Sequence, residues 1–129
     1  MSDISNKRIL LIEDATFMRM MIKNILVKNG FTICGEGEDG YEAIERYKTL
    51  KPDLVIMDII MPNLDGLTAL REIIKEFPDA KIIMCSAMGE ESFVVEAKNL
   101  GAVDYIVKPF QPDRIIATVT KVLKSQKQN

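Results

Sequence analysis

The fold is decided by residues 52–66, which read Pro-Asp-Leu-Val-Ile-Met-Asp-Ile-Ile-Met-Pro-Asn-Leu-Asp-Gly. The apolar run Leu54 to Met57 is typical of a short strand that is buried on both faces of a parallel sheet. Asp58 ends this run, Pro62 stops further strand pairing, and Asp65-Gly66 predicts a turn into a helix. An acid at the carboxyl end of a central parallel strand lies where open α/β sheets place their binding crevice. Taken alone, Asp58 could equally be a helix cap or a turn carboxylate.

Working outward, strand-like and helix-like segments alternate five times along the chain. The expected strands are residues 8–12, 32–35, 54–57, 81–85 and 105–107, and the expected helices are 16–29, 41–50, 67–77, 90–100 and 112–124. Short connections between such units imply right-handed crossovers and a parallel sheet that is covered on both faces. We therefore predict an α/β fold with a doubly wound five-stranded parallel sheet, order 2-1-3-4-5, that is, a flavodoxin-like (βα)5 architecture.

Length and composition indicate one ordinary globular domain. The 129 residues suit a single domain over 1–129 with a core of about 7–124, and 47% of residues are apolar and 28% charged. The net charge of −2 favours neither nucleic acid nor a membrane as a partner. The apolar run Ile9 to Ile12 is too short for a signal-peptide core or a membrane span, so we expect a cytoplasmic monomer.

Cysteine and histidine usage excludes several kinds of chemistry. Cys34 and Cys85 fall on the second and fourth expected strands, three strand spacings or about 14 Å apart, which is too far for a disulfide. We expect both to be small core residues. The chain has no histidine, which rules out histidine acid–base catalysis, histidine metal ligation and a phosphohistidine on this chain.

Polar side chains follow four of the five expected strands. The strand order brings together Glu13 and Asp14, Asp58, Ser86 and Lys108 at one edge of the sheet. Three neighbouring carboxylates repel one another, and a divalent cation relieves that repulsion. Mg²⁺ prefers such hard oxygen ligands. With a metal, a lysine and a hydroxyl nearby, the carboxylate of Asp58 is a candidate nucleophile that forms an acyl phosphate.

At this point the chain resembles a known family. Glu13-Asp14, Met57 to Pro62 with Asp65-Gly66, Ser86-Ala87, and Lys108-Pro109-Phe110 are similar to the signature of response-regulator receiver domains. The resemblance covers residues 7–124, with four motifs in the correct order and spacing. The runs 17–23, 82–88 and 104–110 are similar to those of single-domain chemotaxis members of the family.

The resemblance implies a role for each motif. Asp58 would accept a phosphoryl group from a histidine kinase. Mg²⁺ would bind Asp14, Asp58 and the backbone carbonyl of Ile60 directly, and Glu13 through a water molecule.

The same resemblance implies how the phosphoryl group is held and sensed. Ser86 and the Ala87 N–H would hold phosphoryl oxygens, and Lys108 would pair with the phosphate. The resemblance also implies a cis peptide bond between Lys108 and Pro109. Ser86 and Tyr105 would form a switch that alters the surface of the fourth helix, fifth strand and fifth helix.

The implied function is a phosphorylation-activated switch of a two-component system, not an enzyme acting on other molecules. It would promote only its own phosphorylation and dephosphorylation, with a chemotaxis histidine kinase upstream and the flagellar motor switch protein downstream. The alternative is a phosphorelay intermediate that passes phosphate to another histidine domain. A third reading, an aspartate-dependent phosphatase, lacks the usual second acid, because Ile60 stands two residues after Asp58.

Two further features need an interpretation. Ile60 and Met88 stand where the best-known enteric members often carry polar side chains, and we expect their apolar bulk to slow loss of phosphate by hindering water. Replacing both with polar residues should therefore speed dephosphorylation. Residues 35–40 match the dinucleotide motif G-x-G-x-x-G, but Glu36, Glu38 and Asp39 would repel a pyrophosphate, so a solvated acidic loop is the favoured interpretation.

Overall fold

The computed structural model describes residue 4 and residues 6–125, so the two ends of the expected 1–129 domain lie outside it. Its sheet is parallel and has the order β2-β1-β3-β4-β5, which confirms the doubly wound, flavodoxin-like prediction. The elements are β1 (Arg8–Ile12), α1 (Thr16–Lys28), β2 (Thr32–Gly37), α2 (Gly40–Leu50), β3 (Leu54–Met57), α3 (Gly66–Glu76), β4 (Ile82–Ser86), α4 (Glu91–Asn99), β5 (Asp104–Val107) and α5 (Pro112–Lys124).

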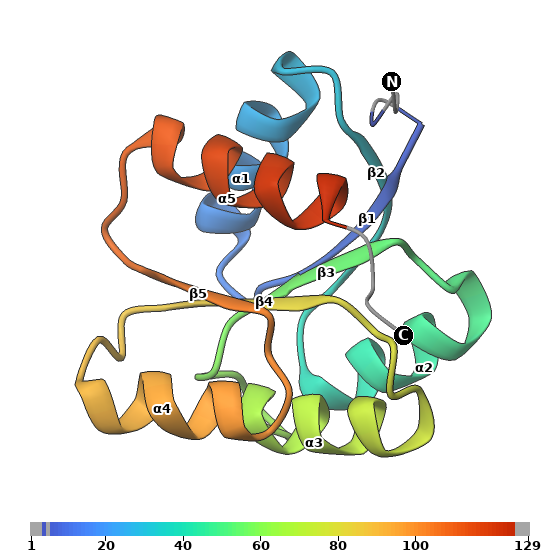
Figure 1. Ribbon diagram of the computed structural model, residues 1–129, viewed down its shortest axis with the longest axis vertical. Helices are drawn as coiled ribbons and strands as arrows, with labels where there is room; N and C mark the ends of the chain where they lie inside the picture. The colour runs from blue at the N-terminus through green and yellow to red at the C-terminus, as the bar shows by residue number, and fades with distance from the viewer. Residues whose placement is uncertain (1–3, 5, 126–129) are drawn as a thin grey trace.

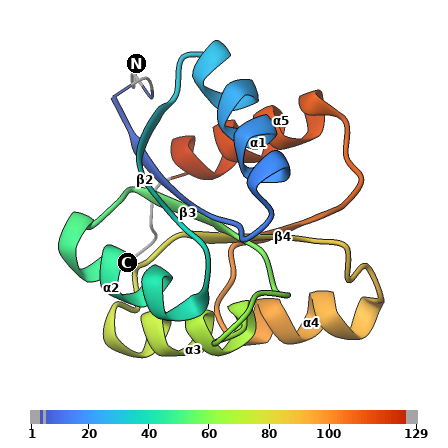
Figure 2. The same cartoon turned by 180° about the vertical axis from the view of Figure 1, so that it is seen from behind.

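The sheet lies between two helical layers. Helices α1 and α5 cover one face, and α2, α3 and α4 cover the other (Figure 1), as the view from behind also shows (Figure 2). Successive strand residues enter opposite cores because side chains alternate across a strand: Leu11 packs under α1 and α5, and Leu10 under the other three helices. All four residues of β3 are buried, as the apolar run 54–57 predicted. Within the described residues, no helix is long and apolar enough to cross a bilayer.

The second strand differs most from its expected bounds. It runs two residues further, because Glu36 and Gly37 continue the pairing with the last two residues of β1. A register shift between Ile9 and Leu10 leaves Cys34 without a paired residue in β1. Cys34 is half-buried and Cys85 buried, and both are free thiols, as predicted.

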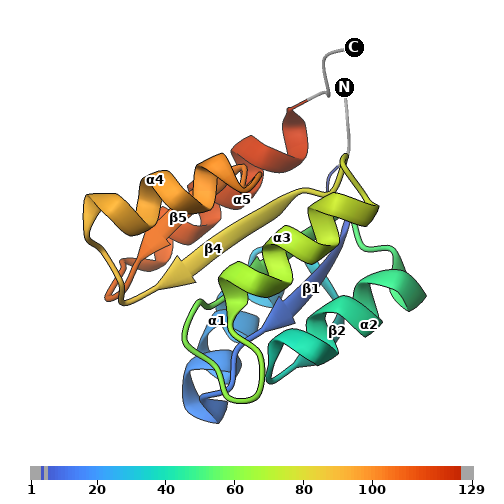
Figure 3. The same ribbon diagram turned by 90° about the horizontal axis from the view of Figure 1, so that it is seen from below.

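The strands all point the same way, so their carboxyl ends lie at one edge of the sheet (Figure 3). The loops that leave this edge carry the acids after β1 and β3 and the lysine after β5. The Lys108–Pro109 peptide bond is cis, as the family resemblance implied.

Candidate functional site

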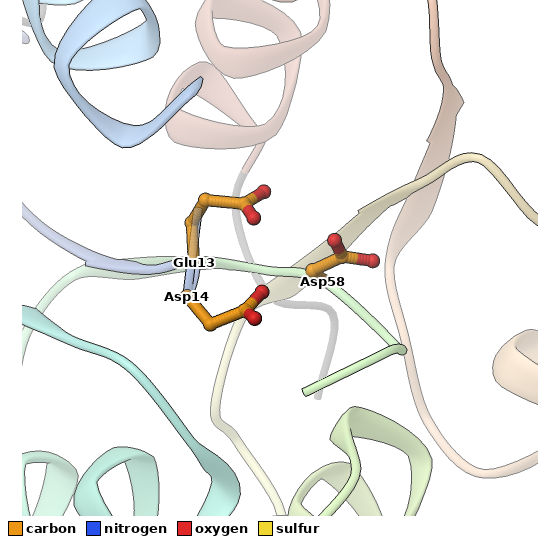
Figure 4. Close-up of side chains that lie close together, drawn as sticks. All are labelled: Glu13, Asp14 and Asp58. Atoms are coloured by element: carbon orange, nitrogen blue, oxygen red, sulfur yellow. The ribbon is translucent and has the colours of Figure 1, made fainter. Parts of the chain in front are cut away.

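Three carboxylates meet where β1 and β3 end. Ile12 and Met57 are paired across these two strands, and the next residues are therefore neighbours as well. One oxygen each from Glu13, Asp14 and Asp58 lies within 4.8 Å of the other two (Figure 4). Glu13 and Asp58 are buried, with 2% and 8% exposure, whereas Asp14 is exposed. Two of the three acids have therefore lost most of their water.

Lys108 is the cation that faces these acids. Its Nζ lies 2.6 Å from Glu13 Oε1 and 2.9 Å from Asp58 Oδ2. Burial lowers the pKa of Lys108, but its hydrogen bonds to the two carboxylates outweigh this effect and raise the pKa above its usual value. Burial raises the pKa of Glu13, and the bond to Lys108 only partly offsets that rise. The lysine remains charged, and it is shared between two acids.

The remaining oxygens of the buried acids accept backbone hydrogen bonds. Asp58 Oδ1 accepts the N–H of Ile59 at 2.6 Å and that of Ile60 at 3.3 Å, and Glu13 Oε2 accepts the Ala15 N–H at 3.1 Å. Asp14 has no hydrogen bond or ion pair with another residue in the described part of the chain. Three carboxylates against one ammonium leave surplus negative charge and hard oxygen donors, and this donor set fits Mg²⁺.

A second part of the edge is built by the ends of β4 and β5. Ser86 is buried, and its Oγ accepts the Met88 N–H at 3.2 Å. The phenol of Tyr105, which is only 4% exposed, donates to the Met88 carbonyl. Burial raises the pKa of this phenol. Ser86 and Tyr105 thus bind the two backbone polar groups of the same residue, Met88.

The structure brings the residues predicted for the site to this one edge. The Lys108 N–H donates to the Ser86 carbonyl at 2.9 Å, which ties the lysine to the serine and to exposed Ala87 beside it. Ile60, two residues after Asp58, has a relative exposure of 58%. The roles of these residues toward a metal or a phosphoryl group remain predictions, and so does the effect of Ile60 and Met88 on dephosphorylation.

The sequence interpretation placed Gly66 in the turn before a helix but missed its close approach to Asp58, and it missed the supporting role of Arg19. A Cβ at Gly66 would lie 1.9 Å from the Asp58 carbonyl oxygen, so only glycine lets α3 begin against the end of β3. Arg19 donates to the Glu13 carbonyl at 2.6 Å and to Glu36 at 3.0 Å. Glycine after the helix-capping Asp65 was a usable signal, whereas nothing local marks Arg19.

The acidic stretch after Cys34 is only partly the solvated loop that was expected. Gly35 to Gly37 belongs to β2, so the G-x-G-x-x-G pattern does not form a strand-to-helix phosphate turn. Glu36 is ion-paired with Arg19 and Lys23, and Asp39 is 9% exposed. Of these three acids, only Glu38, with a side chain 62% exposed, is as solvated as predicted.

The chain is similar in sequence to known chemotaxis proteins. The chain is 54% identical over 118 residues to the chemotaxis protein CheY of Thermotoga maritima, covering 92% of this chain and 98% of that protein. It is 58% identical over 116 residues to CheY of Bacillus subtilis, covering 90% and 97%.

A solved structure with a similar fold is the Borrelia burgdorferi complex of CheX with CheY, BeF3 and Mg²⁺, with a TM-score of 0.88 and 34% identity, covering 90% of this chain and 88% of that chain. The sequence model of the response regulator receiver domain family matches residues 9–120 of this chain. This chain, similar to chemotaxis regulators over most of its length, therefore belongs to the response regulator receiver domain family.

Proposed function

We propose that this receiver domain is a chemotaxis switch in which Asp58 accepts a phosphoryl group from a phosphohistidine of a histidine kinase. The observation that carries the proposal is the meeting of three carboxylates and Lys108 at one sheet edge. In the transfer, an Asp58 oxygen attacks phosphorus, a P–O bond forms and the P–N bond breaks. The leaving imidazole keeps the electron pair and takes up a proton from solvent.

Each residue at the edge has a role in this reaction. Asp14, Asp58 and the Ile60 carbonyl would hold Mg²⁺, with Glu13 acting through a water molecule. When bound, the ion neutralises charge on the phosphoryl oxygens. The Ser86 hydroxyl and the Ala87 N–H would donate to the same oxygens, and Lys108, already 2.9 Å from Asp58, would pair with the phosphoryl group. The similar fold of the Borrelia burgdorferi complex of CheX with CheY, BeF3 and Mg²⁺ supports this assignment.

The contacts around Met88 offer a way for phosphorylation to change the surface that binds a partner. A Ser86 hydroxyl that turns to a phosphoryl oxygen releases the Met88 N–H, and Tyr105 holds the carbonyl of the same residue. Such a change shifts the populations of two conformations of the α4–β5–α5 surface. Val95, Val103 and Val107 on this surface are between 43% and 48% exposed. We propose the flagellar motor switch protein as the partner of this surface.

Mass spectrometry tests the central step. After incubation with a small acyl-phosphate donor and Mg²⁺, the wild type should gain one phosphoryl group and Asp58→Asn none. Asp53→Asn, which changes an acid just before β3, is the matched control and should be phosphorylated like the wild type. An unmodified wild type, or an Asp58→Asn variant modified to the same extent, would contradict the proposal.

A binding test then separates the switch from a phosphorelay intermediate. A motor-switch peptide should bind the phosphorylated form more tightly than the unphosphorylated form. A relay member would instead return its phosphate to a histidine domain. Rapid loss of the phosphoryl group to such a domain, without tighter peptide binding, would favour the relay.

A further inference from the structure

The loop between β3 and α3 contains a turn of a rare kind. The Leu64 N–H donates to the Pro62 carbonyl at 2.7 Å, and Asn63 between them has a φ of +68°. A three-residue turn with positive φ at its centre is strained. Asparagine enters the left-handed region more easily than most residues, but a strained turn persists only where surrounding contacts hold it.

The contact that holds this turn comes from Asp39, directly before α2. Asp39 Oδ2 accepts the Asn63 side-chain amide at 2.8 Å, while its Oδ1 accepts the Glu42 N–H at 2.9 Å and so caps α2. The Glu42 N–H and, next, the Asn63 amide lower the pKa of Asp39. The carboxylate is therefore ionised at neutral pH, and its bond to Asn63 is charge-assisted.

A backbone bond lies beside this pair. The Gly40 N–H donates to the Leu64 carbonyl at 2.8 Å, and a Cβ at Gly40 would lie 2.7 Å from that carbonyl oxygen. Figure 3 shows the β3–α3 loop beside the start of α2. The tip of the loop is thus tied to α2 through contacts that leave no room for a side chain at Gly40.

The base of the same loop is tied to the acid cluster. The Gly66 N–H donates to the Ile59 carbonyl at 2.8 Å, and the N–H groups of Ile59 and Ile60 both reach Asp58 Oδ1. Ile60 therefore lies on a loop that is fixed at the base by Asp58 and at the tip by Asp39. A displaced tip would disturb the backbone beside Asp58.

We propose that Asp39 and Asn63 are positioning residues for the cation site, and that Mg²⁺ affinity depends on their hydrogen bond. This inference rests on the proposed function, because it takes the acid cluster and the Ile60 carbonyl as the Mg²⁺ ligands. A loop held in place before the ion arrives avoids the cost of being ordered on binding. Partners behind the ligands of a metal commonly change its affinity by about tenfold or more.

Calorimetric titration of Mg²⁺ into wild type, Asn63→Asp and the reversed pair Asp39→Asn/Asn63→Asp tests the inference. Asn63→Asp sets two carboxylates against each other, and its added negative charge alone would tighten Mg²⁺ binding. The positioning role predicts the opposite, a weakening of about tenfold. The reversed pair has the net charge of the wild type, keeps a good helix cap and restores a donor to a carboxylate, so its affinity should return to within about twofold.

Two further variants make the result independent of folding and charge. Asn63→Gly removes the amide while allowing positive φ, and it should weaken Mg²⁺ binding by about threefold or more. Asp104→Asn, at the far end of β5, is the control and should bind Mg²⁺ like the wild type. Circular dichroism checks that each variant is folded.

The outcomes separate this inference from the proposed function. Mg²⁺ binding as tight in Asn63→Asp and Asn63→Gly as in the wild type overturns the positioning role and leaves the proposed function standing. A reversed pair no better than Asn63→Asp also overturns it. A wild type that binds no Mg²⁺ overturns the inference and the proposed function together.

Discussion

Two groups of charged side chains lie near the end of β1, and they are built differently. The site cluster has three acids and one cation: Glu13, Asp14, Asp58 and Lys108. The α1–β2 cluster has two acids and two cations: Arg19, Lys23, Glu36 and Glu38. The first group therefore carries surplus negative charge, whereas the second is balanced.

The pKa values of one glutamate in each cluster shift in opposite directions. Burial raises the pKa of Glu13 although Lys108 lies 2.6 Å away. The hydrogen bond from Lys23 is the largest influence on Glu36 and lowers its pKa. A neighbouring cation alone therefore does not lower the pKa of a carboxylate. The direction of the shift also depends on the balance of charge around the group and on its access to water. The site cluster, with its surplus of negative charge and two buried acids, is therefore the one that can accept a further cation.

The largest expected effect is that of removing Lys108. In Lys108→Met, Glu13 and Asp58 remain buried without a cation, so the free energy of unfolding in EDTA should fall by about 3 kcal/mol. Urea unfolding followed by circular dichroism measures this loss. Lys23→Met in the balanced cluster is the matched control, and it should lose less than about 1 kcal/mol. Equal losses in the two variants would remove the distinction between the clusters.

The next effect concerns which acids bind the cation. Asp14→Asn should weaken Mg²⁺ binding by at least about tenfold, because it removes the exposed oxygen donor that no described residue occupies. Glu38→Gln removes an equal charge from the other cluster and should change the affinity by less than about twofold, since salt screens exposed charges. Calorimetric titration gives both values. Similar weakening in both variants would mean that general negative charge attracts the ion.

The smallest effect is a dependence of stability on pH. The folded-state pKa of Glu36 is below its usual value, so its contribution is present above that value and is lost as the pH falls through the folded pKa. At pH 7, Glu36→Gln should be less stable than the wild type by about 0.5 kcal/mol, since the pair is partly exposed. The two unfolding curves should converge in acid. A difference that persists there would assign the effect to packing.

The sequence predicted the frame of the molecule well because the frame depends on local patterns. The apolar run 54–57, the prolines and glycines between segments and the helical stripes placed all ten elements within about two residues. The acids after β1 and β3 were found because parallel strands end at one edge. By contrast, Asp39 was assigned to a solvated loop, since its partner Asn63 lies 24 residues away and no local pattern joins them.

The sequence by itself determined the strand order, the edge at which the polar residues meet and the family resemblance, all of which depend on the order and spacing of residue types. Only the tertiary structure decided that Lys108 bridges Glu13 and Asp58, that Glu36 is balanced by Arg19 and Lys23, and that Asp39 holds Asn63. The physical reason is that charge interactions depend on distance and burial. Residues 95 positions apart, such as Glu13 and Lys108, acquire that distance and burial only when the whole sheet has formed.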